Sequence, residues 1–157
     1  MSAEQQLERL ERRVQALQSQ AQPAQHEVRA KGFVLDDENG KVRAWLSVLK
    51  DGPALLLYDE NGKPRAGLVV RKDGPGLTLA DENGKRSALL DVDKDGPGLS
   101  LWDENGELRA RLVVLQDGPG LTLADENRKC RALLFVRKDG PGLGLYDEKG
   151  RVLYRAP

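Results

Sequence analysis

The sequence predicts an all-β repeat protein, an antiparallel meander of hairpin units preceded by one short helix. Three observations predict this fold class. A 22-residue segment recurs without insertion from Gly32 to Arg151, in five full copies and a partial sixth. Apolar residues alternate with other residues inside each copy, and two glycine-containing turn signals punctuate it. A fixed period of this length indicates one structural unit built repeatedly.

Residues 1–20 form the first expected element, a helix with coiled-coil character. Its apolar residues Leu7, Leu10, Val14 and Leu17 are spaced by three, four and three, as at heptad positions a and d. Ser2 and Gln5 have the arrangement of a capping box. The helix has fewer than three heptads, so it would act as a clamp on an assembly that the repeats also stabilise. A lone amphipathic helix lying on the sheet is the alternative.

Residues 21–31 are expected to be a linker, and residues 32–157 the repeat domain. In the copy GLTLADENGKRSALLDVDKDGP, Leu77 and Leu79 alternate in one stretch and Ala88, Leu90 and Val92 in the next. Alternation with a period of two is typical of a strand with one buried face. The Asn-Gly between the stretches favours a type I′ hairpin turn. Each unit is therefore one hairpin, and the chain should form about a dozen strands.

The register follows if each Asn-Gly and Asp-Gly dipeptide is the centre of a two-residue or four-residue loop. The proline after each Asp-Gly, such as Pro75, makes the four-residue loop plausible there. Three-residue loops are not expected, because they would place leucines opposite polar residues. The expected aliphatic pairs are Leu57–Ala66, Leu55–Leu68, Val70–Leu77 and Leu68–Leu79. On the other face we expect Trp45–Tyr58, Gly67–Ala80, Leu89–Trp102, Arg111–Ala124 and Leu133–Tyr146. The same register predicts a charge ladder of Arg43–Glu60, Arg65–Glu82, Arg109–Glu126 and Arg131–Glu148.

The regular aliphatic face needs a cover that this chain does not encode. No second sheet or long helix is available, and a sheet of a dozen strands closed on itself would leave a lumen too wide for leucine and valine to fill. We therefore predict self-association, with three chains forming a β-prism. The predicted oligomerisation residues of the repeats are Leu55, Leu57, Leu68, Val70, Leu77, Leu79, Leu90, Leu101, Leu112, Leu123 and Leu134.

The helix favours three copies. The window RVQALQ, Arg13 to Gln18, resembles the Arg-x-x-x-aliphatic-Glu pattern of trimeric coiled coils, with Gln18 in place of Glu. A coiled-coil clamp followed by β repeats resembles the general plan of phage tail fibres and bacterial stalk proteins. This architectural resemblance implies a structural role, a rigid trimeric rod or spacer in a fibre, stalk or surface appendage. Growth into filaments through open sheet edges is a remote alternative.

A glycan- or protein-binding module is the other function to consider. Aromatic side chains with arginines are typical of binding surfaces. The candidate residues are Trp45, Tyr58, Arg65, Trp102, Arg109 and Tyr146. The alternative is that these side chains stiffen the sheet by cross-strand stacking.

Other chemistry is not expected. The window from Asp91 to Gly96 begins like a calcium loop, but Trp102 stands where a bidentate Glu is needed. His26 and Cys130 are single residues without partners at ligand spacing, so we expect no enzyme, metal or cofactor. Acidic and basic residues balance at 25 each, which gives no reason to expect nucleic acid. No Sec-type signal peptide or membrane span is evident, so the default location is the cytoplasm or an assembled appendage or virion.

Overall fold

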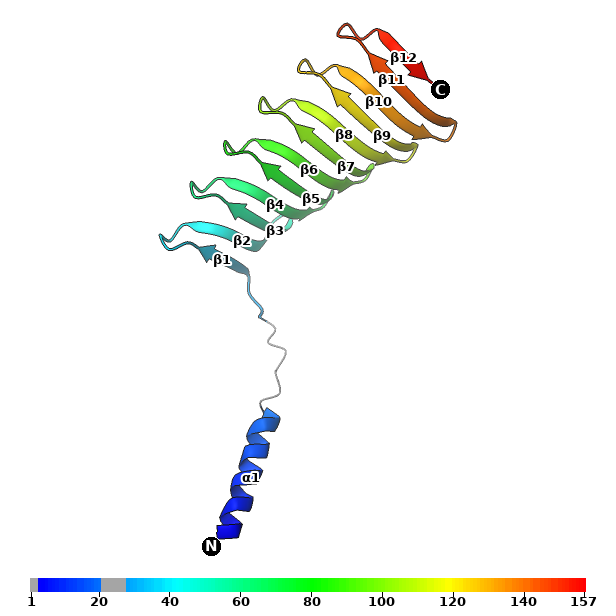
Figure 1. The fold of residues 1–157 in the computed structure, drawn as a ribbon. Helices are drawn as coiled ribbons and strands as arrows, with labels where there is room; N and C mark the ends of the chain where they lie inside the picture. The colour runs from blue at the N-terminus through cyan, green and yellow to red at the C-terminus, as the bar shows by residue number, and fades with distance from the viewer. Residues whose placement is uncertain (1–2, 21–27) are drawn as a thin grey trace. The chain divides into compact units, whose positions relative to one another are not determined.

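The computed structural model describes residues 3–20 and 28–157, with only the backbone for residues 17–20. It contains one helix, α1 (Ala3–Gln20), and one sheet of twelve strands (Figure 1). Two compact units result, Met1–Ala30 and Lys31–Pro157. The predicted cap residue Ser2 and most of the predicted linker (residues 21–27) lie outside the described residues.

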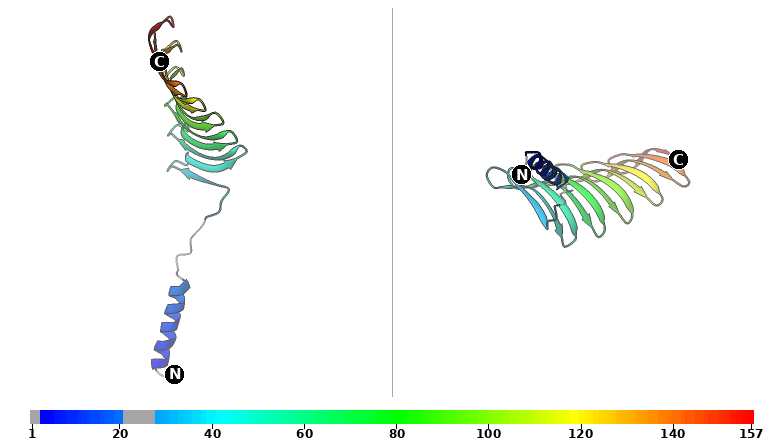
Figure 2. Two further views of the ribbon diagram at one scale, coloured as in Figure 1. Left: turned by 90° about the vertical axis from the view of Figure 1, so that its right-hand side faces the viewer. Right: turned by 90° about the horizontal axis from the view of Figure 1, so that it is seen from below.

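The twelve strands follow one another in sequence order as a single antiparallel meander, which confirms the predicted fold class. They are β1 (Gly32–Asp36), β2 (Val42–Leu49), β3 (Gly52–Tyr58), β4 (Pro64–Arg71), β5 (Gly74–Ala80), β6 (Arg86–Asp93), β7 (Gly96–Trp102), β8 (Leu108–Leu115), β9 (Gly118–Ala124), β10 (Cys130–Arg137), β11 (Gly140–Tyr146) and β12 (Val152–Ala156). The strands are curved, and the hairpin turns form a row along each side of the sheet (Figure 2).

The turn inside each unit is a three-residue loop followed by a bulge, so the prediction against three-residue loops is wrong. In the second unit the Asp59 N–H donates to the Lys63 carbonyl at 2.9 Å, and the Gly62 N–H donates to the Asp59 carbonyl at 3.0 Å. The register then shifts by one residue between Leu57 and Tyr58. The bulge restores the parity that the odd loop would break, so Leu57 still faces Ala66 as predicted.

The turn between units lies one residue earlier in the chain than predicted. Arg71 pairs with Gly74, so the two-residue loop is Lys72-Asp73 and Gly74 is already the first residue of β5. Gly74 has a φ of 129°, and a Cβ built on it would lie 1.7 Å from the Val92 carbonyl oxygen of the next strand. Glycine is therefore needed here for close strand approach and not as the second residue of a type I′ turn.

This shift moves every pair across the inter-unit turns by two residues. Leu68 faces Leu77, and Val70 faces Pro75, in place of the predicted Leu68–Leu79 and Val70–Leu77 pairs. The predicted outward pairs are wrong for the same reason: Trp45 pairs with Leu56, Gly67 with Thr78, Leu89 with Ser100, Arg111 with Thr122 and Leu133 with Gly144. Since a shift of two keeps each side chain on its face, the assignment of residues to faces is unaffected.

Lysines connect the turns of successive units. Lys63 Nζ donates to the Glu82 carbonyl at 2.9 Å, and Lys41, Lys85 and Lys129 make the same contact with Glu60, Glu104 and Glu148. Two successive units depart from this pattern, each at one position. Glu107 replaces the lysine, Arg128 replaces the turn glycine, and Arg128 Nε lies 3.1 Å from Glu107 Oε2. The two departures therefore compensate each other.

We predict that Arg128→Gly stabilises the protein. Arg128 has a φ of 62°, in the left-handed region that costs a residue with a Cβ about 1–2 kcal/mol. The ion pair it would lose is exposed on the arginine side, and such pairs contribute at most about 1 kcal/mol. The melting temperature measured by circular dichroism should rise by about 2–4 °C. Arg128→Ala, which loses the ion pair without relieving the φ, is the control and should not raise it.

Candidate functional site: an uncovered aliphatic face

One face of the sheet, named here the aliphatic face, carries only hydrocarbon side chains apart from the Tyr154 hydroxyl. Alternation and register assign its members strand by strand. They are Phe33, Leu35, Ala44, Leu46, Val48, Pro53, Leu55, Leu57, Ala66, Leu68, Val70, Pro75, Leu77, Leu79, Ala88, Leu90, Val92, Pro97, Leu99, Leu101, Ala110, Leu112, Val114, Pro119, Leu121, Leu123, Ala132, Leu134, Val136, Pro141, Leu143, Leu145, Tyr154 and Ala156.

Within the unit Lys31–Pro157, the aliphatic face is uncovered. Its central leucines are about half exposed, with Leu68 at 48% and Leu90 at 50%. Among the described residues, Ala54, on the opposite face, is the only buried hydrophobic one. Full burial of a leucine contributes about 1.5–3 kcal/mol, so each half-exposed leucine leaves roughly 1 kcal/mol unused. Summed over the sheet, this is comparable with the whole net stability of a domain, about 5–15 kcal/mol.

All eleven sheet residues predicted for oligomerisation lie on the aliphatic face, from Leu55 in β3 to Leu134 in β10. The prediction left out the first hairpin, where Phe33, Leu35, Leu46 and Val48 continue the same face. Their alternation was a sufficient signal. The prolines after the inter-unit glycines, such as Pro75 opposite Val70, also lie on this face.

The predicted heptad residues of α1 are exposed as well. Leu7, Leu10 and Val14 are 59%, 57% and 51% exposed. Their spacing places them on one side of the helix. Leu17 belongs to the same helix, but its side chain lies outside the described part of the chain. Each of the two units, taken by itself, thus presents an exposed apolar surface.

The predicted binding residues are separated by the structure into two groups. Trp45, Tyr58, Trp102 and Tyr146 lie on the face opposite the aliphatic one, here called the second face. Arg65 and Arg109 belong instead to a network of hydrogen bonds at the turns. Arg65 Nε donates to the Ala80 carbonyl at 3.0 Å, and Arg109 Nε to the Ala124 carbonyl at 2.9 Å.

The turn network replaces the predicted charge ladder. Each of these arginines also faces the aspartate that opens its own turn: Arg65 Nη1 lies 3.6 Å from Asp59 Oδ2, and Arg109 Nη1 lies 3.1 Å from Asp103 Oδ2. Arg43 and Arg131 repeat both contacts: their Nε atoms donate to the Tyr58 and Tyr146 carbonyls, and their Nη1 atoms face Asp37 and Asp125. The predicted partners Glu60, Glu82, Glu126 and Glu148 are not used, because the two-residue shift across the inter-unit turns brings the arginines to the carbonyls of Tyr58, Ala80, Ala124 and Tyr146.

The opening aspartates are acceptors for the turn backbone. Asp59 Oδ1 accepts the N–H groups of Asn61 and Lys63, both at 2.9 Å. The Lys63 N–H, followed by the Asn61 N–H and the Arg65 guanidinium, holds the pKa of Asp59 below its ordinary value against the opposing effect of desolvation. The pKa values of Asp37, Asp103, Asp125 and Asp147 are lowered by the equivalent backbone contacts.

These shifts predict a loss of stability in acid. Because the folded pKa lies below the unfolded value of about 3.8, the stabilisation is complete above that value and declines as pH falls through it toward the folded pKa. Melting temperatures should be constant from pH 7 to about 5 and decline below about 4. Asp59→Asn combined with Asp125→Asn should lower the melting temperature at pH 7 and flatten this decline. If the melting temperature of the double variant declined below pH 4 as steeply as that of the wild-type chain, the turn aspartates would not be the cause of the decline.

Other sequence features show no assembled chemistry. In residues 3–20 and 28–157, no three side chains among His, Cys, Asp and Glu gather as metal ligands. Asp93 Oδ1, from the calcium-like window, accepts the backbone N–H of Asp95 and of Gly96. Cys130 is a half-buried free thiol, and His26 lies outside the described residues. No helix of the described chain is both long and apolar enough to cross a membrane.

Comparison with known proteins adds no relationship: no protein-family model matches the sequence, and no curated protein matches it.

Proposed function

We propose that this chain is a self-assembling structural protein, a trimeric rod or spacer of a fibre, stalk or surface appendage. The observation that supports it most is the uncovered aliphatic face, which runs without a charged side chain through all twelve strands. Contiguous exposed apolar surfaces of this extent mark interaction sites in proteins. The repeat makes successive units present the same leucine, valine and alanine rows, so a copy of the same chain is a matching partner.

A three-sided prism agrees with the width of the face. Each long strand points three residues at it, as Ala66, Leu68 and Val70 do in β4. Such a strip is about 20 Å wide with its margins, and three strips arranged as a triangle would bring the central leucines close to the common axis. Twelve strands at about 4.8 Å give a rod on the order of 50–60 Å long.

The helix supports three copies over two. A two-sheet sandwich would also cover the aliphatic face, because sheets pack about 10 Å apart. The exposed Leu7, Leu10 and Val14 with the Arg13–Gln18 window favour a three-stranded coiled coil in the same assembly. The helix is too short to be stable alone, so its assembly depends on that of the repeats.

Absolute mass tests the proposal. Light scattering after gel filtration should give three times the 17.3 kDa mass of the chain. A version that starts at Gly32 should retain the trimer with weaker association, since it keeps the aliphatic face. A monodisperse monomer would reject the assembly, and a dimer of the full chain would replace the prism with a two-sheet sandwich.

A further inference from the structure

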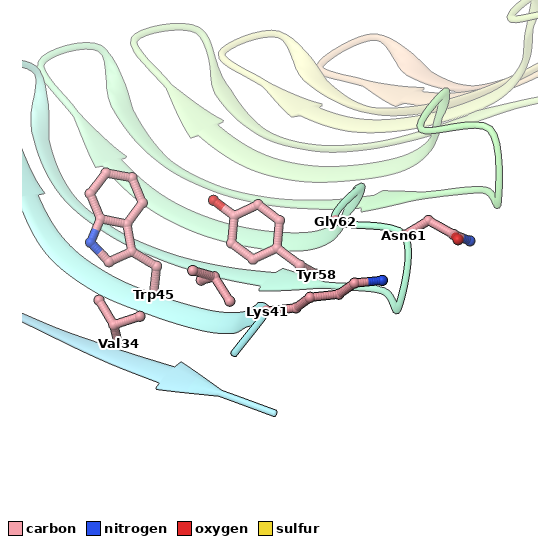
Figure 3. A pocket seen from close by; sticks show the side chains of 7 residues that line it. Val34, Lys41, Trp45, Tyr58, Asn61 and Gly62 are labelled. Atoms are coloured by element: carbon pink, nitrogen blue, oxygen red, sulfur yellow. The ribbon is translucent and has the colours of Figure 1, made fainter. Parts of the chain in front are cut away.

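On the second face, Trp45 and Tyr58 have different surroundings from Trp102 and Tyr146, although all four side chains are half-buried. Tyr146 lies against Gly144, where an added Cβ would be 2.7 Å from the tyrosine hydroxyl oxygen. Trp102 is covered by Arg86, whose Cζ lies 5.5 Å from the ring centroid. Trp45 and Tyr58, in contrast, line an open depression of about 590 Å³ at the β1–β3 end of the sheet (Figure 3).

The depression has an aromatic wall and a polar rim. Figure 3 shows the Trp45 and Tyr58 rings on the same side of the sheet, with Val34 beside Trp45. Lys41 and the Asn61 turn complete the lining. Lys41 Nζ uses one hydrogen bond, to the Glu60 carbonyl at 3.0 Å, so its ammonium group has donors left. No acidic side chain lines the depression, which is therefore suited to a ligand with an apolar ring face and negative charge.

A second, basic depression of about 240 Å³ continues this surface across β3–β6. Leu56 connects the two, because it is the partner of Trp45 in the sheet and lines the second depression. The floor there is low at Gly67 and Ala80, and Arg65, Arg71 and Arg86 line it without an acidic residue. From β2 to β6 the surface spans about 19 Å at about 4.8 Å per strand, longer than a single ring.

We propose that this surface binds an acidic oligosaccharide, with one sugar ring against Trp45 and Tyr58 and carboxylate groups at Lys41 and the arginines. Sugar rings present C–H groups on one side and hydroxyls at the edge, which matches an aromatic wall with lysine and asparagine at its rim. The charge of the lining favours an acidic sugar over a neutral one. Both depressions lie within one chain, so the inference does not rest on the proposed trimer.

Calorimetric titration of the full chain with tetragalacturonate tests this inference, and the repeat supplies matched controls. Tyr58→Ala should weaken binding by about tenfold, whereas Tyr146→Ala, at the equivalent position, should leave it within about twofold. Lys41→Gln should weaken binding and reduce its salt dependence. Lys85→Gln removes the same lysine-to-carbonyl contact, at 3.0 Å from Glu104, and should leave binding unchanged.

A second readout keeps the test independent of the folding of these variants. In Trp102→Phe, Trp45 is the only tryptophan, and its fluorescence should change on titration. Equal losses in Tyr58→Ala and Tyr146→Ala, equal affinity for the neutral maltotetraose, unchanged Trp45 fluorescence, or no binding at millimolar ligand would each overturn the proposal.

Discussion

Lysine in the centre of the aliphatic face is expected to convert the assembly into monomers. In Leu68→Lys with Leu112→Lys, two strands each present an ammonium group to the surface proposed to be buried. A trimer would bring three such groups together at each level, where burying an unpaired charge costs several kcal/mol. Light scattering should show loss of the trimer at concentrations where the wild-type chain is fully assembled. The far-ultraviolet circular dichroism signal of β structure should also weaken, because a single sheet without its partners lacks a hydrophobic core.

The matched control places the same charge on the other side of the same strands. Val69 and Val113 directly follow Leu68 and Leu112 and point to the second face. Val69→Lys with Val113→Lys should therefore retain the trimer. If the Leu68/Leu112 variant stays trimeric, the aliphatic face is not the interface. If both double variants dissociate, lysine destabilises the sheet whichever face it lies on, and the loss of the trimer does not identify the interface.

The division of the sheet into two faces could be predicted because it depends only on parity. Alternation assigns Leu77 and Leu79 to one face and Thr78 to the other, whatever the loop lengths, provided that the total shift is even. Two details differ from the prediction, the bulge after Leu57 and the earlier turn at Lys72-Asp73. The bulge compensates for the odd number of residues in the loop, and the earlier turn moves the pairing by two residues. Both therefore leave each side chain on its predicted face.

The pairing across the inter-unit turns could not be predicted, because the glycines of the two turns have different roles. Gly62 has a φ of 77° at the end of a three-residue loop, whereas Gly74 has a φ of 129° at the start of a strand. In the sequence both follow a turn-forming residue, Asn61 or Asp73, and both therefore match the second residue of a type I′ turn. The cross-strand partner of Trp45 and the contacts of Arg65 depend on which two residues form the loop between units.

The open depression on the second face is only partly visible in the sequence. Trp45 and Tyr58 stand out there as two large aromatic residues, but Leu89 and Trp102 form an equivalent large pair. What distinguishes them is the position of Arg86 over Trp102, where the first full unit has Val42. Val34 and Lys41 join the depression through the β1–β2 hairpin. Side-chain placement of this kind is not encoded in alternation.

Replacement of an inter-unit glycine is expected to destabilise the sheet strongly. Gly74→Ala places a Cβ 1.7 Å from the Val92 carbonyl oxygen, and its φ of 129° is a conformation that residues with a Cβ rarely adopt. The backbone strain costs about 1–3 kcal/mol. Moving β6 away from β5 to relieve the clash costs a further 1–3 kcal/mol or so, as for an overpacked core. Chemical denaturation should show a total loss on the order of 4 kcal/mol.

Gly140→Ala separates the two causes, because Gly140 has the same φ of 129° but no atom within 4 Å of an added Cβ. The strand beside it, β12, ends at Ala156. Gly140→Ala should therefore show the strain alone, about 1–3 kcal/mol, and retain assembly. Gly74→Ala should lose more and should weaken assembly, since a displaced β6 disturbs the leucine rows of the aliphatic face. Equal losses in the two variants would show that backbone conformation, and not strand approach, requires glycine at these turns.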